Sequence, residues 1–593
     1  MNTDSATRPG SNKKHFQIMI HDQNYGTWSF NEPNNTIELK KDDYPELANI
    51  SPVESKLMTK DVFTVDDSGK IDIVHSITRT TTAFSGVLLV ENNKTFGRTS
   101  NNKRLLYKCI PDDKHLPAFL LPYDIKIAFS KIYKNKYIVF KFDHWLNKHP
   151  QGVIVETIGD VDNLEAFYEY QLYCKSLHIS ITDMTNRTRA ILNQKTSDEY
   201  IEQILHNPLF AIEDRRSEYV FTIDPQNSMD FDDGFSIREC AEGYKITVYI
   251  ANVYFWLEIM GLWNSFSKRV ATIYLPDRRR PMLPTILSDT LCSLQKGQSR
   301  FAFCMEMIIG KDESIGEPVY KNAIISVSKN YVYEDPRMLA KDTHYKMLLE
   351  ATEKIDSTVK NSHDLVAFWM IQMNKNCAEY MIAHKTGIFR TASIHNTALH
   401  SAVDLNHVGE DTQRLIQLWN NSAGNYVPFS DDSEQMVHAI MNSKSYIHIT
   451  SPIRRLVDLL NQMTMMVKLG TVSRLSNDAA EFLGKWMSEL TYINTATRSI
   501  RKIQTECDVL TRCFQTPDIM DILHEGVVFD KLNKNDGVFA YMVYLEKLRL
   551  LAKITTDQDL ANYSKHTFRI YLFQDEYNAK KKIRLQLDLK FSD

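Results

Sequence analysis

Four aspartates stand within ten residues of one another, directly after a short apolar segment, and this cluster is the strongest constraint on the fold. The apolar segment, Tyr219 to Ile223, has the composition of a buried β-strand, and the acidic residues that follow it are Asp224, Asp230, Asp232 and Asp233. At an effective dielectric constant of about 20, two unit charges about 4 Å apart repel by roughly 4 kcal/mol. A folded site that holds all four carboxylates therefore requires cations or raised pKa values.

Mg²⁺ is the cation that this cluster favours, because it prefers hard oxygen ligands. In extended chain Asp230 and Asp232 share a face while Asp233 points the other way, so a turn at Gly234 is expected to gather all three around one centre. Two metals about 3.5–4 Å apart activate a water and stabilise the leaving oxygen of a phosphodiester. For the D-x-D-D segment alone, a solvated acidic loop is the alternative; an EF-hand is disfavoured because its spacing fails at the fifth position.

Bulk properties permit an RNA-binding protein but do not require one. The 593 residues, 43% of them hydrophobic, predict three or four soluble domains. No apolar run reaches the ~20 residues of a membrane helix and the start has no signal-peptide core, so we expect a cytoplasmic protein, with the nucleus left open. The eight cysteines form no C-x-x-C pair and are expected to be reduced thiols. With a net charge of −4, RNA binding must depend on local basic patches and stacking.

The pattern of hydrophobic residues changes twice along the chain. Short alternating stretches such as Gly86 to Val90 and Lys136 to Phe142 predict small β-barrels in the first part. After about residue 360 helical patterns dominate, as in Leu365 to Lys385. Strand patterns return at the end, where Gly526 to Phe529 and Gly537 to Tyr544 fit a five-stranded OB-like barrel. The fold class expected is therefore α+β with several domains.

The aspartate cluster resembles the signature of the RNase II/RNB family, in which a T/S-I-D-P strand end is followed at fixed spacing by D-x-D-D. Further blocks resemble that family's V-H-I-A-D-V strand, its Y-L-P…M-L-P…L-S…L-C-S-L block, its long helix and its T-S-P-I-R-R-x-x-D segment. These blocks are Thr247 to Val253, Ile273 to Leu294, Trp369 to Tyr380 and Thr450 to Asp458. Five blocks in the family's order are very improbable by chance.

The resemblance implies two N-terminal cold-shock-like OB barrels, a central mixed α/β RNB catalytic domain and a C-terminal OB-like RNA-binding barrel. We place the boundaries at 1–15 for a disordered N-terminus, 16–100 and 101–185 for the two barrels, 186–518 for the catalytic domain and 519–593 for the last barrel. The flanks are similar to the exosome-type branch of the family, without the extra N-terminal endonuclease domain of some exosome subunits.

The activity implied by the resemblance is hydrolysis of single-stranded RNA from its 3′ end to nucleoside 5′-monophosphates, with Mg²⁺ as cofactor. The expected partner is single-stranded RNA, with no membrane, and the expected state is a monomer. Partner proteins from an RNA-decay complex are possible, and their identity is left open. Preference for RNA would rest on contacts to the 2′-hydroxyl.

The resemblance also assigns roles to individual residues. Asp224, Asp230 and Asp233 are expected mainly to bind metal, and Asp232 to bind metal or to orient the terminal nucleotide and water. The catalytic set expected is Asp232, Arg454, Tyr274 and Glu506. Tyr274 is expected to stack on the last base, a contact worth about 1–3 kcal/mol, and Glu506 to lie near the terminal nucleotide.

The Thr450 to Asp458 block also predicts an anion site from its residue types alone. Ser451 is a good N-cap and Pro452 suits the first helical position, so a helix is expected to begin there. Its N-terminus, with Arg454 and Arg455, would bind a phosphate. A further basic run, Arg278, Arg279 and Arg280, is either a solvated loop or part of the lining of an RNA channel.

Departures from the family pattern leave all four aspartates in place. Tyr249 and Asn252 stand where the family has His and Asp, and Leu456 replaces a common Tyr. The main alternative is a catalytically inactive RNA-binding regulator on the same fold, as in relatives that have lost the acidic cluster. A phosphatase acting on small substrates is a second alternative, but it does not explain the β-barrel flanks.

Overall fold

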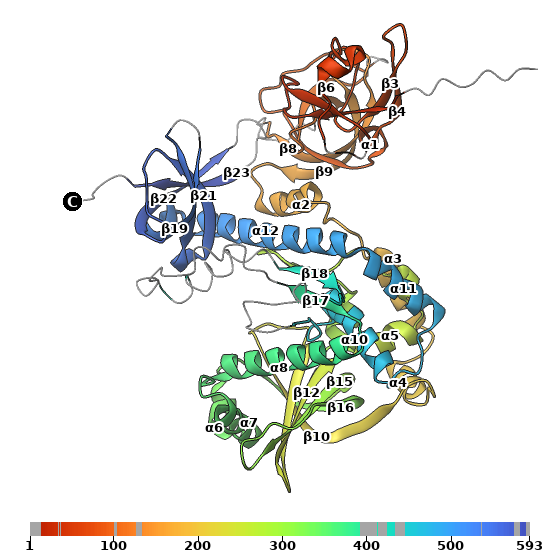
Figure 1. The fold of residues 1–593 in the computed structure, drawn as a ribbon, viewed down its shortest axis with the longest axis vertical. Helices are drawn as coiled ribbons and strands as arrows, with labels where there is room; N and C mark the ends of the chain where they lie inside the picture. The colour runs from red at the N-terminus through yellow and green to blue at the C-terminus, as the bar shows by residue number, and fades with distance from the viewer. Residues whose placement is uncertain are drawn as a thin grey trace, which may run out of the picture. The chain divides into compact units, whose positions relative to one another are not determined.

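The computed structural model describes residues 14–33, 35, 37–99, 103–125, 133–391, 409, 412, 424–432, 445–534, 537–574 and 581–588 (Figure 1). The chain folds into two compact units: Met1–His178, Val509–Leu523 and Phe568–Asp593 form the first, and Ile179–Asp508 and His524–Thr567 the second. None of the helices in these described ranges is both long and apolar enough to cross a membrane. Of the N-terminal segment 1–15 that we predict to be disordered, residues 1–13 lie outside the described residues.

The first unit begins with a four-stranded antiparallel sheet in the order β2-β1-β3-β4. Its strands are β1 (Phe16–Ile20), β2 (Trp28–Asn31), β3 (Val62–Val65) and β4 (Ile71–His75). Burial alternates along β1, where Phe16, Ile18 and Ile20 point inward, as expected for a half-buried strand. The 3₁₀ turns η1 (Lys41–Asp43) and η2 (Pro45–Leu47) and the short helix α1 (Ile77–Thr80) complete this part.

A closed five-stranded barrel follows, in the order β5-β6-β7-β9-β8. Its strands are β5 (Phe84–Leu88), β6 (Leu106–Pro111), β7 (Phe119–Pro122), β8 (Lys136–His144) and β9 (Gln151–Asp160), and helix α2 (Leu164–Cys174) packs against β9. Strand β5 pairs with β6 and β8, so it belongs to this barrel. The expected boundary at residue 100 gave β5 to the first domain; because β5 is needed to close the second barrel, we propose a boundary between β4 and β5 instead.

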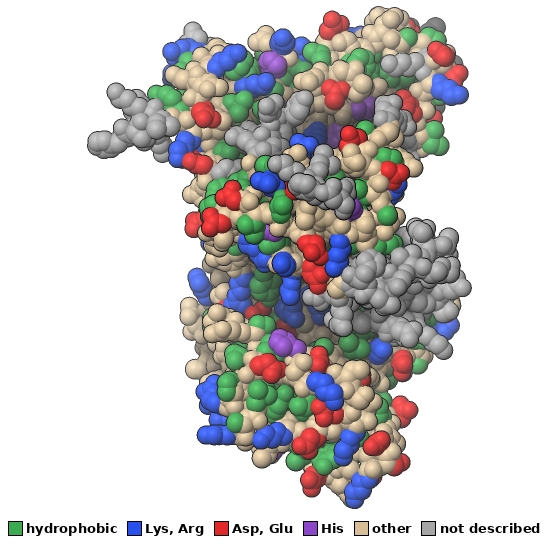
Figure 2. Space-filling view, turned by 90° about the vertical axis from the view of Figure 1, so that its left-hand side faces the viewer, with side chains coloured by type: hydrophobic (Ala, Val, Ile, Leu, Met, Phe, Trp, Pro, Cys, Tyr) green, Lys and Arg blue, Asp and Glu red, His purple; other side chains and the backbone are tan. Residues whose placement is uncertain are grey.

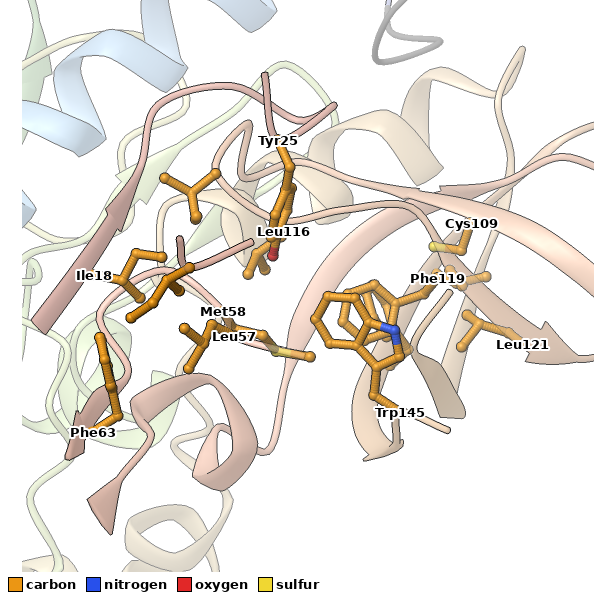
Figure 3. Packing of buried hydrophobic residues seen from close by; sticks show 14 of the residues in the cluster. Ile18, Tyr25, Leu57, Met58, Phe63, Cys109, Leu116, Phe119, Leu121 and Trp145 are labelled. Carbon is orange, nitrogen blue, oxygen red and sulfur yellow. The ribbon is translucent and has the colours of Figure 1, made fainter. Parts of the chain in front are cut away.

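One hydrophobic core joins the first sheet to this barrel. Ile18 and Phe63 from the sheet, Met58 from the segment before β3, and Phe119 and Trp145 from the barrel are buried in a single cluster (Figure 3). The Tyr25 ring meets the Trp145 ring edge to face, with the centroids 6.2 Å apart. The sheet and the barrel therefore share one apolar interior.

The second unit is built on another closed five-stranded barrel, β10-β11-β12-β15-β16. Its strands are β10 (Ile212–Asp224), β11 (Asp233–Cys240), β12 (Gly243–Ala251), β15 (Ser299–Gly310) and β16 (Val319–Val332). Neighbouring strands are antiparallel except β10 and β16, which run parallel and place Asp224 opposite Val332. The C-terminal end of β10 and the N-terminal end of β11 therefore lie at the same edge of the barrel.

Helices precede this barrel and follow it. Those before and within it are α3 (Thr182–Leu192), α4 (Ser197–Leu205) and α5 (Tyr254–Ile259); those after it are α6 (Pro336–Lys341), α7 (Thr343–Ile355) and α8 (Ser362–Ala383). Helix α8 crosses the barrel beside β16, and the Tyr380 ring lies 5.9 Å from the Tyr320 ring (Figure 1). Between β12 and β15 lie η3 (Trp263–Ser265), the hairpin β13 (Ile273–Tyr274) and β14 (Arg279–Arg280), and the π-helix η4 (Ile286–Leu291).

The second unit continues with a small sheet, two helices and the part of a third helix that ends at Asp508. Strands β17 (Ile388–Thr391) and β18 (Asn425–Pro428) pair, followed by α10 (Leu456–Lys468), α11 (Asn477–Ser488) and α12 (Leu490–Gln515). Helix α10 meets the barrel through the Gln462 Nε2 atom, which donates to the Ala251 carbonyl at the end of β12.

Five strands follow the 3₁₀ turn η7 (Pro517–Met520), as expected for the C-terminal segment. They are β19 (His524–Asn533), β20 (Phe539–Leu545), β21 (Leu550–Thr556), β22 (Lys565–Gln574) and β23 (Lys581–Leu587), with the turn η8 (Glu546–Leu548) between β20 and β21. Strands β19, β20 and β21 form an antiparallel meander, and β22 pairs with β23. The expected α+β class with several domains is confirmed.

Candidate active site

The aspartate cluster lies in the turn that connects β10 to β11. Asp224 is the last residue of β10 and Asp233 the first of β11, so both are positioned by barrel strands. Asp230 and Asp232 lie in the loop between them. This loop is anchored from two sides: the Asp232 carbonyl accepts a hydrogen bond from the Ala251 amide, and the Phe231 carbonyl accepts one from the Leu294 amide.

Ser293, from the block resembling L-C-S-L, holds the same loop. Its hydroxyl donates to the Met229 carbonyl at 2.8 Å and accepts from the Phe231 amide at 3.0 Å. Ser293 is fully buried, so these bonds are formed away from water, where an unpaired backbone group is costly. Ser293 therefore positions the aspartates through the backbone of their loop.

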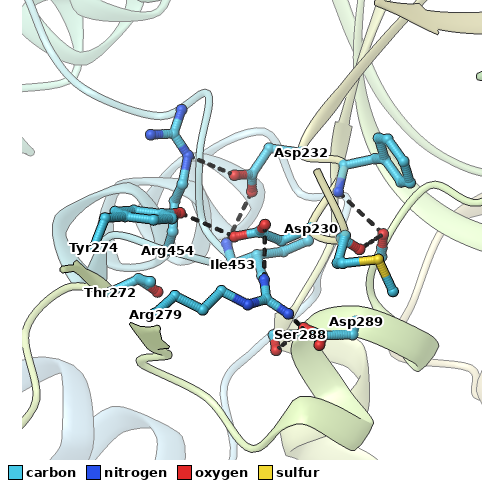
Figure 4. A network of polar contacts seen from close by, with 12 residues as sticks. Asp230, Asp232, Thr272, Tyr274, Arg279, Ser288, Asp289, Ile453 and Arg454 are labelled. Atoms are coloured by element: carbon cyan, nitrogen blue, oxygen red, sulfur yellow. Dashed lines mark hydrogen bonds and ion pairs between the residues drawn. The ribbon is translucent and has the colours of Figure 1, made fainter. Parts of the chain in front are cut away.

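Asp232 is held by the segment Thr450 to Asp458 (Figure 4). One carboxylate oxygen accepts from the Ile453 amide and the other from the Arg454 Nε atom, each at 3.0 Å. Burial raises the Asp232 pKa to about 7, although the Arg454 charge and the Ile453 hydrogen bond act in the opposite direction. The Arg454 Nη2 atom also donates to the Ser451 hydroxyl, so the guanidinium is fixed beside the carboxylate.

Asp230 is held by residues of the β13–β14 hairpin (Figure 4). Its carboxylate accepts from the Arg279 Nη1 atom at 2.9 Å and from the Tyr274 hydroxyl at 3.1 Å. Arg279 also forms an ion pair with Asp289, which accepts a hydrogen bond from Ser288. Tyr274 remains 42% exposed, so its ring is accessible to a ligand while its hydroxyl is held.

Asp224 and Asp233 differ from the other two aspartates. Each has a buried carboxylate oxygen, Oδ2, that has no hydrogen-bond partner. Burial raises the pKa of both carboxyl groups, and the charge of Asp233 raises the Asp224 pKa further. Two buried, mutually repelling carboxylates with unbonded oxygens are suitable ligands for a hard divalent cation.

The structure thus divides the cluster into two pairs, which sequence reasoning did not anticipate. No group of three or more His, Cys, Asp or Glu side chains is arranged to hold a metal ion within the described ranges. Arg279 bonds to Asp230 instead, and Arg454 to Asp232. Metal binding by Asp230 and Asp232 stays a prediction, whereas the unbonded oxygens of Asp224 and Asp233 fit a divalent cation.

The expected helix start at Pro452 is wrong, because α10 begins at Leu456. Residues 451–455 form a turn in which the Arg454 and Arg455 amides donate to the Ser451 carbonyl. Arg455 is extended, with φ −136° and ψ 124°, and bridges to Ala271, which delays the helix. Asp458 accepts from the Ser451 amide and from Arg455, so it orients Arg455.

Three further predicted residues, Arg278, Arg280 and Glu506, have ion-pair partners outside the aspartate cluster. Arg280 is buried against Asp277, whereas Arg278 is mostly exposed and lies 3.7 Å from the same carboxylate. Glu506 lies on α12, 3.8 Å from the Lys502 ammonium, and none of the described hydrogen bonds joins it to the aspartates. Helix α12 reaches the site through Gln504, which accepts from the Tyr274 amide. The roles of these residues stay predictions.

Tyr333 is a site residue that the sequence reasoning missed. Its amide donates to the Asp224 carbonyl, and its ring stacks on His363 with the centroids 3.9 Å apart. Burial and the charges of Asp233 and Asp224 raise its pKa to about 12. The available signal was its place directly after β16, the strand that runs parallel to β10.

The substitutions at Tyr249 and Asn252 do not reach the carboxylates. The Tyr249 hydroxyl bonds to Glu218 and Ser236 in the barrel. Asn252 donates to Asn322 and to the Met466 sulfur. Both are therefore packing residues of the barrel in this structure.

Comparison with known proteins identifies two domains. The RNB domain family matches residues 212–357 and 338–469, and the Dis3-like cold-shock domain 2 family matches residues 106–170. DIS3-like exonuclease 2 of Schizosaccharomyces pombe is 26% identical over 242 residues, which are 37% of this chain and 25% of that protein. Ribonuclease R of Aquifex aeolicus is 28% identical over 205 residues, 34% of this chain and 28% of that protein. The matched segments thus span about a quarter of these relatives.

Two solved structures have a similar fold. RNase R of Mycoplasma genitalium, in complex with ribose methylated single-stranded RNA, superposes with a TM-score of 0.67 at 15% identity, covering 96% of this chain and 100% of that one. Yeast Ssd1, described as a pseudonuclease, superposes with a TM-score of 0.57 at 13% identity, covering 95% of this chain and 82% of that one. At these identities the likeness concerns the fold alone.

Proposed function

Because the chain belongs to the RNB family, we propose that it is a 3′-to-5′ exoribonuclease that hydrolyses single-stranded RNA to nucleoside 5′-monophosphates. The observation that carries this proposal is the pair of buried, unbonded carboxylate oxygens on Asp224 and Asp233. A protein that only bound RNA would have no use for two unpaired buried carboxylates, which oppose folding unless a cation or protons neutralise them.

Asp224 and Asp233 would hold the divalent cation, for which we propose Mg²⁺. When bound, such a cation polarises a phosphoryl oxygen and lowers the pKa of a bound water. The remaining groups of the site are the chain's own. Arg454 offers a guanidinium for the phosphate of the last linkage, and Asp232 fixes its direction. Tyr274 offers an exposed ring for the terminal base while Asp230 holds its hydroxyl.

The proposed partner is single-stranded RNA, bound by a monomeric protein in the cytoplasm. On the face drawn in Figure 2, Lys and Arg side chains are interspersed with Asp and Glu side chains. With a net charge of −4, such a surface gives no broad attraction for nucleic acid. Recognition is therefore expected to rest on local contacts such as those of Arg454 and Tyr274, together with stacking.

An inactive RNA-binding regulator on the same fold is the second candidate. The similarity to yeast Ssd1, a pseudonuclease, is the observation that favours it. Against it stand the four aspartates, all present, and the arginines that position two of them.

The test is digestion of a 5′-labelled single-stranded RNA by the full chain with Mg²⁺ or with a chelator. We expect products that shorten from the 3′ end, with Mg²⁺ only. Asp232→Asn should lower the rate by at least about 100-fold, because the amide cannot hold Arg454 by charge. Asp312→Asn, in an exposed turn, is the control and should cleave normally. RNA that is bound tightly by the wild-type protein, yet left intact with every divalent metal, would establish the regulator.

A further inference from the structure

Arg390, on strand β17, is a buried arginine whose guanidinium bonds to no carboxylate of the described residues. Its side chain is only 7% exposed, and its Cζ atom lies 4.9 Å from the centre of the Tyr426 ring. Strand pairing places Arg390 directly opposite Tyr426. A buried charge is costly unless it is paired. The ring contact alone compensates this cost only in part.

The backbone beside Arg390 leaves space for this guanidinium. A Cβ atom on Gly424 would lie 2.7 Å from the Arg390 Nη2 atom and equally close to the Thr391 carbonyl oxygen, a backbone atom that cannot move aside cheaply. The Arg390 amide donates to the Tyr446 carbonyl at 2.7 Å, which fixes the strand. Helix α12 fixes Tyr426, because Asn494 accepts from the Tyr426 amide and donates to its carbonyl. The guanidinium is therefore held in place by neighbours that do not neutralise it.

Two further arginines face the same region. Arg455 bonds to Asp458 through Nη2, but its Nε atom is buried without a hydrogen-bond partner. Arg501 lies on α12 and is exposed. Burial, together with the charges of Arg501 and Arg455, lowers the Arg390 pKa to about 10. The charges of Arg455 and Arg501 thus repel that of Arg390, and the buried carboxylate of Asp458 already bonds to Arg455.

We propose that Arg390, Arg455 and Arg501 together bind one phosphodiester of the RNA strand, distinct from the phosphate expected at Arg454. The chemistry favours phosphate because guanidinium groups present planar pairs of N–H donors that match its oxygens. The position favours the RNA backbone, because Arg455 directly follows Arg454, which bonds to Asp232. In this proposal, an RNA strand whose 3′ end lies at the aspartates passes the three arginines. The identity of the ligand as RNA rests on the proposed function.

The test combines a change in the protein side chain with a change in one RNA phosphate and measures whether their effects on binding are coupled. Chelator is present so that no cleavage occurs. The full chain is titrated into short, 5′-fluorescent single-stranded RNAs, each with one neutral methylphosphonate among the linkages nearest the 3′ end. We expect one linkage at which the neutral group weakens wild-type binding about 10-fold, the loss of a charge-assisted contact. In the Arg390→Met protein, a methylphosphonate at that linkage should not weaken binding any further. The slope of log Kd against log salt should fall by about 0.7.

Arg337→Met is the matched control, because its side chain is 81% exposed on α6. It should leave both the linkage dependence and the salt slope unchanged. Arg501→Met, at an exposed position, repeats the cycle if Arg390→Met fails to fold, as judged by its thermal transition. Uniform weakening of all RNAs with an unchanged salt slope would make Arg390 a structural residue and overturn the proposal.

A titration with inorganic phosphate tests whether the three arginines bind a free anion instead of an RNA phosphodiester. If phosphate stabilises the wild-type protein but not Arg390→Met, while no linkage couples to Arg390, the ligand is a free anion and the RNA assignment is wrong. A protein that shows the coupling but never cleaves RNA would contradict the proposed nuclease activity and leave this site established, so the two failures are distinguishable.

Discussion

At Asp224 and Asp233, two carboxylates lie close together without an arginine bonded to either, whereas Arg279 and Arg454 bond to Asp230 and Asp232. The repulsion among the four aspartates is therefore offset in two ways. One pair is neutralised by the protein itself. The other is left for protons or a cation, and this is the physical basis for expecting a metal-dependent reaction.

The same residues give a pH dependence of stability in the absence of metal. Burial raises the Asp232 pKa to about 7 and raises the Asp224 and Asp233 pKa values. Between about pH 5 and 7 the folded protein then binds more protons than the unfolded chain, whose Asp pKa is about 3.9. The free energy of unfolding should therefore fall as the pH rises through this range, by an amount on the order of a few kcal/mol.

Urea titrations in chelator between about pH 5 and 7 measure this fall. Asp232→Asn should make the slope shallower, because the amide does not titrate. Asp312→Asn should leave the slope unchanged. Hydrogen bonds lower the Asp312 pKa, so this carboxyl group titrates below the range. A free energy of unfolding that rose with pH over this range would contradict the assignment.

The sequence indicated residues that the structure brings together at the candidate site, but it did not indicate their pairing. Strand composition, carboxylate spacing and the resemblance indicated the four aspartates, Arg454 and Tyr274. The pairing depends on contacts between distant segments, such as the Arg279 and Asp230 side chains, which no local pattern encodes. Tyr333 was missed for the same reason, because only the parallel pairing of β10 with β16 brings it to Asp224.

At the scale of elements, the loop between β10 and β11 depends on Ser293. Ser293→Ala should destabilise the protein by about 1–3 kcal/mol, since the Met229 carbonyl and the Phe231 amide lose a buried partner. Activity should fall more than stability explains, because Asp230 and Asp232 lie in this loop. Ser314→Ala removes a hydroxyl from an exposed turn and should change stability by less than about 0.5 kcal/mol. Urea unfolding and RNA cleavage measure both; a Ser293→Ala protein as stable and active as Ser314→Ala would show that the loop needs no anchor.

Element types were predicted better than element boundaries. Capping preferences favoured a helix from Pro452, but the bridge between Arg455 and Ala271 keeps the backbone extended until Leu456. Likewise the expected boundary at residue 100 separates β5 from β6 and β8, the two strands with which β5 pairs. In both cases a non-local backbone contact overrode a local preference.

At the scale of the whole molecule, the chain forms two compact units, and the proposed metal ligands lie in one of them. The first unit has its own core, around Phe63, Phe119 and Trp145. Asp224 and Asp233 belong to the second unit. A ligand that binds only a folded unit stabilises that unit by mass action, so the two units should respond differently to a metal.

Scanning calorimetry should therefore resolve two transitions, of which Mg²⁺ raises one. At a Mg²⁺ concentration about 100-fold above its Kd, the stabilisation is about 2.7 kcal/mol. Asp224→Asn should abolish the shift. Phe119→Ala should lower the other transition, because deleting a buried aromatic ring costs about 3–5 kcal/mol. If Mg²⁺ moved both transitions equally in the wild-type protein, and Phe119→Ala also lowered both, the units would unfold as one and this division of the molecule would be wrong.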